Sequence, residues 1–245
     1  MSLKLKPALA MPFTGRQALI ALAIGTALCL PAAYIDSIPH YVGWLSTLAS
    51  IIASVIVGYE VRIMRAQFAN GSGAPLPSWF GNPKDMVLAI IADFIGGVTV
   101  ASILLAIAFI GIALAVTGVM PADLVTQVKI SFLHSPVLTA PIVIPAFIML
   151  IFAFIPLLPF ALMMQVHYAY ENRLSAVFEW RAIWRITWNQ FATIIVVGIL
   201  SFLALALLAF LAAAAFWPLA ALVSFLGSAV TTNLCAQIYL QGRSA

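Results

Sequence analysis

The sequence contains very few charged residues. Only 7% of its 245 residues are Asp, Glu, Lys or Arg, whereas 64% are hydrophobic. A soluble domain carries about 25% charged residues, which keep its surface hydrated. The scarcity excludes an ordinary soluble domain and indicates that lipid surrounds most of the chain. The net charge of +4 is dispersed along the sequence, so it favours membrane orientation over nucleic-acid binding.

Cysteines and common catalytic motifs are also scarce. Cys29 and Cys235 each lie in an apolar run, without disulfide or metal-site spacing. The sequence has no Gly-rich phosphate loop, Cys-x-x-Cys pair or nucleophile elbow. The N-terminus lacks a compact signal peptide with a cleavage site, so the first apolar segment is expected to be a retained span. We therefore expect a non-enzymatic protein without a cofactor, although pigment or haem ligation stays open for His40, His134 and His167.

Long apolar runs predict an all-α integral membrane bundle in a single domain of residues 1–245. A hydrocarbon core of about 30 Å needs roughly 20 apolar helical residues. Six segments meet this requirement, and Pro218 separates the last two as a tight hairpin. The six predicted spans cover about residues 17–35, 41–59, 98–118, 137–164, 191–216 and 219–240.

The third apolar run is too long for a single span. Residues 86–117 would form about 48 Å of helix at roughly 1.5 Å per residue. Gly96-Gly97 offers a natural break in its middle. We therefore expect an interfacial helix from Met86 to Ile95 on the cytoplasmic side, followed by the span. Pro83 suits the first position of that helix.

The basic residues predict the orientation. If both termini are cytoplasmic, ten of the eleven Lys and Arg residues lie inside and only Lys129 lies outside. This asymmetry is the bias that the positive-inside rule describes. The ten inner residues are Lys4, Lys6, Arg16, Arg62, Arg65, Lys84, Arg173, Arg181, Arg185 and Arg243.

The second cytoplasmic connection carries a helical pattern of tryptophans. Trp180, Trp184 and Trp188 recur every four residues, which places them on one stripe of a helix, and Arg181 and Arg185 flank that stripe. Such a helix would hold its indoles at headgroup level and its guanidinium groups among lipid phosphates. The alternative is an ordinary aromatic belt with orienting charges.

The first cytoplasmic connection, Gly58 to Asp85, is basic, rich in Gly and Pro, and carries a tryptophan near its tip. We expect Arg62 and Arg65 to bind phosphate headgroups or an acidic partner, while Trp79 anchors the tip at the membrane interface. The alternative is again that these charges only orient the spans.

Two weaker patterns concern chemistry. His167 and Glu171 stand one helical turn apart and could share a metal, but an ordinary interfacial histidine is the alternative, and no metal site is predicted. Several prolines in the fourth span favour a kinked helix of the kind that lines transport sites. Against transport, ionisable residues near mid-membrane are almost absent, with Asp93 the nearest.

A family resemblance rests on motifs in both cytoplasmic connections. The order is Gly58-Tyr59, a basic stretch, a Gly-rich turn and Leu76-Pro77-x-Trp79, with further likeness around residues 178–191 and in the closing AQIYLQG. The chain thereby resembles an uncharacterised prokaryotic multi-pass membrane-protein family, domain of unknown function 4013. The resemblance implies a membrane fold and location, but no activity.

These patterns together predict a protein of the prokaryotic cytoplasmic (inner) membrane. The expected role is a non-enzymatic accessory or scaffold subunit of a membrane complex, which contacts the bilayer, anionic headgroups or other membrane subunits. Small residues in the spans permit close helix packing and favour this role. The alternative is a transporter or carrier for a small apolar or lipid-like molecule.

Overall fold

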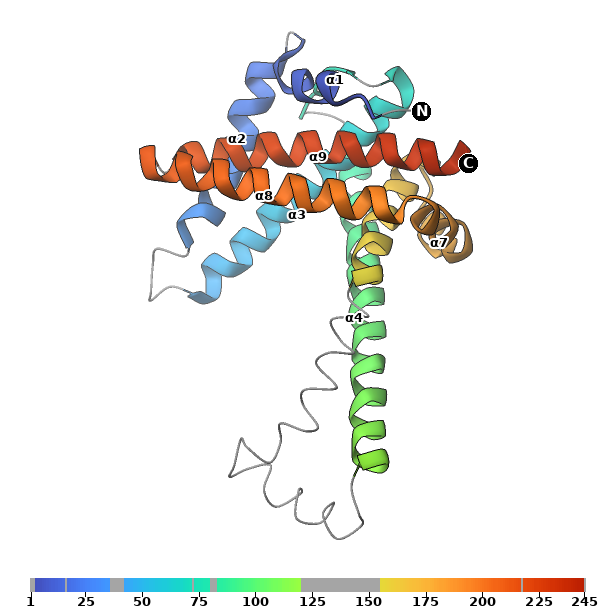
Figure 1. Cartoon of the computed structure of the whole chain (residues 1–245). Helices are drawn as coiled ribbons and strands as arrows, with labels where there is room; N and C mark the ends of the chain where they lie inside the picture. The colour runs from blue at the N-terminus through green and yellow to red at the C-terminus, as the bar shows by residue number, and fades with distance from the viewer. Residues whose placement is uncertain are drawn as a thin grey trace. The chain divides into compact units, whose positions relative to one another are not determined.

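The regular secondary structure of the described residues is all helical (Figure 1). The computed structural model describes residues 3–15, 17–35, 42–71, 73–79, 83–119, 155–216 and 218–244, and these ranges contain no strand. This confirms the predicted all-α class for the described residues. The elements are α1 (Leu5–Ala10), η1 (Met11–Phe13), α2 (Ala18–Ile35), α3 (Val42–Asn70), α4 (Pro83–Val119), a helix described over 155–171, η2 (Leu174–Phe178), α7 (Trp180–Asn189), α8 (Phe191–Ala215) and α9 (Pro218–Ser244).

Several helices are long and apolar enough to cross a membrane. Within the described ranges there are three such helices: Pro83–Ile110, Phe191–Ala215 and Pro218–Ser244. A fourth candidate is the pair Leu5–Phe13 and Ala18–Leu30, which bends by 87°. Residues 120–154, which hold most of the predicted fourth span, lie outside the described part. The count of six spans therefore stays a prediction.

Two expectations about helix continuity are wrong, whereas the bounds of the membrane spans stay predictions. The helix α4 runs without interruption through Gly96-Gly97, so no separate interfacial helix ends before that pair. It does begin at Pro83, as predicted. The helix α3 continues past Tyr59 to Asn70, so Arg62 and Arg65 lie on a helix and not in a loop. A turn follows this helix, and Gly71 (φ +82°) and Gly73 (φ +114°) adopt left-handed backbone angles that glycine tolerates best.

The chain divides into two compact units, residues 1–95 with 162–245 and residues 96–161. In the first unit α9 is the central helix, because it contacts α1, α2, α3, α7 and α8. It forms the predicted hairpin with α8, and the two helices run side by side (Figure 1).

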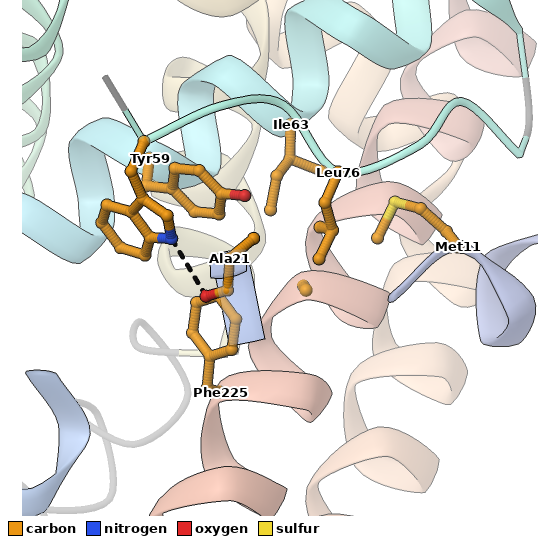
Figure 2. Packing of buried hydrophobic residues seen from close by; sticks show 8 residues of the cluster. Met11, Ala21, Tyr59, Ile63, Leu76 and Phe225 are labelled. Atoms are coloured by element: carbon orange, nitrogen blue, oxygen red, sulfur yellow. Dashed lines mark hydrogen bonds between the residues drawn. The ribbon is translucent and has the colours of Figure 1, made fainter. Parts of the chain in front are cut away.

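A cluster of buried side chains joins the elements of the first unit (Figure 2). It brings together η1, α2, α3, α9 and the segment after the Gly-rich turn. Its members are Met11, Ala21, Tyr59, Ile63, Leu76, Trp79, Phe225 and Ala229.

Candidate functional site

The first basic element, residues 58–85, carries two arginines that contact the protein's own chain. Arg62 Nη1 donates a hydrogen bond to the backbone carbonyl of Trp79 at 2.9 Å. Arg65 Nη1 lies 3.6 Å from Asp85 Oδ1, and its guanidinium carbon lies 5.4 Å from the ring centroid of Tyr168. These contacts connect the last turns of α3 to the loop that follows and to the start of α4.

Trp79 lies in the core of the first unit, and only 8% of the residue is exposed. Its indole stacks on the ring of Tyr59, with centroids 3.8 Å apart and planes within 4°. Its Nε1 donates a hydrogen bond to the carbonyl of Ala21 at 3.0 Å, drawn as the dashed line in Figure 2. The Tyr59 hydroxyl donates to the carbonyl of Pro77 at 2.8 Å. The indole therefore fastens the loop to α2 and α3 instead of projecting from its tip.

The Gly-Tyr pair at the start of this element has a packing role. A Cβ atom at Gly58 would lie 3.3 Å from the Cα of Met86, so glycine allows α3 and α4 to approach closely. Together with the contacts of Tyr59, Pro77 and Trp79, this gives most of the first family motif a structural explanation.

The second element, α7, has the predicted stripe. Its three tryptophans are 50%, 43% and 63% exposed at Trp180, Trp184 and Trp188. The opposite side of the helix buries Ile183 and Ile186. The rings of Trp184 and Trp188 stack with centroids 6.1 Å apart. The helix thus packs aliphatic side chains against the protein and exposes indole rings, where an ordinary amphipathic helix would expose polar side chains.

The two arginines of α7 are exposed beside these indoles. Neither Arg181 nor Arg185 has a carboxylate within ion-pair distance among the described residues, whereas Arg65, Arg173 and Arg243 each have at least one. We call the exposed set Trp180, Arg181, Trp184, Arg185 and Trp188 the α7 face. The structure brings these five predicted site residues together on one surface, and their binding role stays a prediction.

A hydrogen-bonded network holds the chain just before α7. His167 Nδ1 lies 2.6 Å from the Tyr239 hydroxyl, and its Nε2 lies 3.1 Å from Glu179 Oε2. Arg173 also pairs with Glu179. The bonds from His167 and Arg173 lower the pKa of the Glu179 carboxyl, although burial opposes them.

His167 and Glu171, the possible metal ligands of the sequence pattern, bind different partners in the structure. Both ring nitrogens of His167 face protein groups, and Glu171 instead contacts Arg243 at 2.9 Å and Arg173 at 3.7 Å. Among the described residues no three His, Cys, Asp or Glu side chains gather as metal ligands would. His40 and His134 lie outside the described residues.

A polar ladder fixes the end of α9. Asn233 Nδ2 donates to Gln67 Oε1 at 2.8 Å, and Gln237 Nε2 donates to Asn233 Oδ1 at 2.9 Å. The backbone nitrogen of Lys4 donates to Gln237 Oε1 at 2.8 Å. These bonds join α3, α9 and the segment before α1, and they explain Gln237 of the closing motif.

Sequence analysis missed a cavity beside Glu60. The cavity has a volume of about 460 Å³, and it lies between α3, α8, α9 and the helix over 155–171. Ser228 donates a hydrogen bond to the Glu60 carboxylate. A signal for this site was present, since small hydroxyl-bearing residues recur on one side of α9. The cavity-lining residues of α9 are Ser224, Ser228, Thr231, Thr232 and Cys235.

Comparison with known proteins places the chain in a family. Residues 42–217 match the family model described as "Protein of unknown function (DUF4013)", and the chain belongs to this family. No curated protein and no solved structure matches the chain. The match covers both basic elements and α8, and membership agrees with the apolar helices of a membrane protein.

Proposed function

We propose that this member of the DUF4013 family is a non-enzymatic accessory or scaffold subunit of a complex in the prokaryotic inner membrane. In this proposal the α7 face lies in the anionic headgroup layer of the cytoplasmic leaflet. The observation that carries it is the exposure of the α7 face, with two guanidinium groups that have no carboxylate partner in the described chain. The first basic element contributes no such surface, because its groups contact the protein itself.

Physical chemistry favours a headgroup environment for the α7 face. Indole rings are amphipathic and partition to the membrane–water interface. Each basic residue near an anionic leaflet contributes about 1 kcal/mol to membrane attraction. Arg181 and Arg185 together would therefore contribute about 2 kcal/mol by the same estimate.

The helix α8 supports the subunit role. Only 6% of its most apolar stretch is buried in the described structure, and this favours a surface that lipid or helices of another subunit cover. An added Cβ at Gly198 would meet no atom within 4 Å, so the α8 backbone is open to close approach there. Large exposed side chains on α8 include Phe202, Leu203, Leu207, Phe210 and Leu211.

The experiment is extraction of native membranes into polymer-bounded lipid discs, followed by mass spectrometry of the proteins and lipids retained. Wild type is compared with Arg181→Gln/Arg185→Gln and with the matched control Lys4→Gln/Lys6→Gln. The control removes the same charge from two exposed side chains at the start of α1, Lys4 just before the helix and Lys6 within it. We expect wild type and control to retain a partner at a fixed ratio together with anionic lipid, and the α7 variant to lose anionic lipid. A chain recovered alone, or equal lipid content in all three, contradicts the proposal.

The orientation has its own test. In the proposed topology a cysteine introduced at Ser72 is cytoplasmic, and one introduced at Ser131 is external. A membrane-impermeant thiol reagent should label the second in intact cells and the first only after the inner face is opened. Labelling in the opposite order would remove the cytoplasmic assignment of α7.

A carrier for a small apolar or lipid-like molecule is the second candidate function. The observation that favours it is the cavity beside Glu60, because helices α8 and α9 that line it are long and apolar enough to cross a membrane. Flux of a labelled hydrophobic molecule into proteoliposomes tests it, and leakage no faster than through protein-free vesicles would exclude it.

A further inference from the structure

The cavity beside Glu60 has two walls of different chemistry. On one side α8 contributes Phe202, Leu205 and Ala209, which are apolar. On the other side α9 contributes hydroxyl groups, and α3 contributes the Glu60 carboxylate. Its volume of about 460 Å³ falls within the range of roughly 300–1,000 Å³ that is typical of small-molecule sites.

The carboxylate of Glu60 has no basic partner among the described residues. No Lys, Arg or His occurs among the described residues that line the cavity, and Ser228 supplies the hydrogen bond that Glu60 accepts. The carboxylates of Asp85, Glu171 and Glu179, in contrast, each lie beside a basic side chain. A charged carboxylate away from water is costly unless a cation accompanies it. The cavity therefore holds an acidic side chain that no basic group of the described chain accompanies.

A second polar group in the cavity is also unsatisfied. The Nε2 atom of Gln165 is buried and has no hydrogen-bond partner among the described residues, although Gln165 lines the cavity. An unpaired buried donor costs about 1–3 kcal/mol. Its presence in the same cavity as Glu60 points to an occupant that supplies the partner that the described residues do not.

We propose that this cavity binds a small amphipathic cation. The ammonium group of the ligand pairs with Glu60 beside Ser228, and its apolar body lies against Phe202, Leu205 and Ala209. An acceptor atom on the ligand would bind Gln165. This binding proposal does not depend on the α7 face. It names a ligand class for the carrier, the second candidate function. Only transport of the ligand, and not its binding, rests on that carrier function.

The test uses a pair of probes with the same shape. Benzyltrimethylammonium carries a quaternary nitrogen, and neopentylbenzene has carbon in its place. Binding to the full-length protein in detergent is measured by calorimetry and by the shift in unfolding temperature. Wild type should bind the cation at least tenfold more tightly than the neutral probe. Equal affinity, or no binding of the cation, overturns the proposal without any variant.

Two variants assign the binding to the cavity. Glu60→Gln keeps the size of the side chain and removes its charge, so it should weaken the cation at least tenfold and leave the neutral probe unchanged. Ala209→Phe keeps the carboxylate and fills the apolar wall, so it should weaken both probes. Lys4→Gln is the control, because this exposed residue does not line the cavity. If both cavity variants bind the cation like wild type while remaining folded, the site is elsewhere and the proposal is wrong.

A flux measurement in proteoliposomes separates this inference from the carrier function. Binding without flux keeps the site and removes the carrier. If the protein carries neopentylbenzene and does not prefer the cation, the carrier function is supported and the proposed ligand class is wrong.

Discussion

The two aromatic–basic elements resemble each other in composition but differ in how they use their side chains. In the first element Trp79 is buried and Arg62 and Arg65 contact the chain itself. In α7 the tryptophans are exposed, and neither arginine has a carboxylate partner among the described residues. The tryptophan beside arginines therefore packs in the core in the first element, whereas the tryptophans beside arginines in α7 lie on the protein surface.

The difference follows from what packs beneath each element. The indole of the first element meets the flat ring of Tyr59 and the buried carbonyl of Ala21 on α2. Because α7 buries Ile183 and Ile186, its aliphatic side already fills the contact with the bundle. Its indoles must then point outward, where the membrane interface accommodates them.

The largest expected effect is on Trp79. Trp79→Ala removes the stack on Tyr59 and the hydrogen bond to Ala21, so the free energy of unfolding should fall by about 3–5 kcal/mol, as for other buried aromatic truncations. Thermal unfolding in detergent measures the loss. Trp184→Ala, on the exposed α7 face, is the control and should cost far less. Equal losses in the two variants would show that the elements do not differ.

A smaller effect is expected at Arg62. Arg62→Gln removes the charged donor to the Trp79 carbonyl, and hydrogen bonds to charged groups contribute about 1.5–3 kcal/mol. The matched variant Arg181→Gln should stay within about 0.5 kcal/mol of wild type, as exposed substitutions usually do. The same unfolding measurement compares them. Retained stability in Arg62→Gln would mean that water replaces the guanidinium at no cost.

The smallest effect is a pH dependence at the chain segment before α7. Hydrogen bonds lower the pKa of Glu179 below its ordinary value of 4.5, so its stabilising contribution is present above that value and is lost as pH falls through the lowered pKa. Hydrogen exchange in residues 172–179, corrected for intrinsic rates, should accelerate in acid. Glu179→Gln should remove this dependence. An unchanged pH profile in the variant would assign the acid sensitivity to another group.

Sequence patterns predicted most helices, because hydropathy and period report directly on lipid contact and helix faces. The α8–α9 hairpin and the tryptophan stripe of α7 are where the sequence placed them. The end of α3 was missed because hydropathy falls at Glu60 while helix formation continues to Asn70. The break at Gly96-Gly97 was wrong because two glycines cost only about 2 kcal/mol in a helix. A break at this point would leave backbone N–H and C=O groups unpaired in lipid, at a cost of several kcal/mol each. The continuous helix is therefore the more stable arrangement.

The candidate sites were harder to predict, because they depend on contacts distant in sequence. The hydrogen bond from Trp79 reaches Ala21, 58 residues away, and Glu60 meets Ser228, 168 residues away. No local pattern distinguishes a buried indole from an exposed one when both stand beside arginines. The polar side of α9 was visible in the sequence, but only the fold places Glu60 against it.

Tryptophan fluorescence in discs of brominated lipid tests the central distinction between the two elements most directly. Bromine on the upper acyl chain quenches indoles that lie at the membrane interface. Replacing Trp180, Trp184 and Trp188 with Phe should remove a large quenchable component, whereas Trp79→Phe should remove only emission that bromine does not quench. A quenchable component that survives the triple substitution and disappears with Trp79→Phe would contradict the assignment of α7 as the interfacial surface.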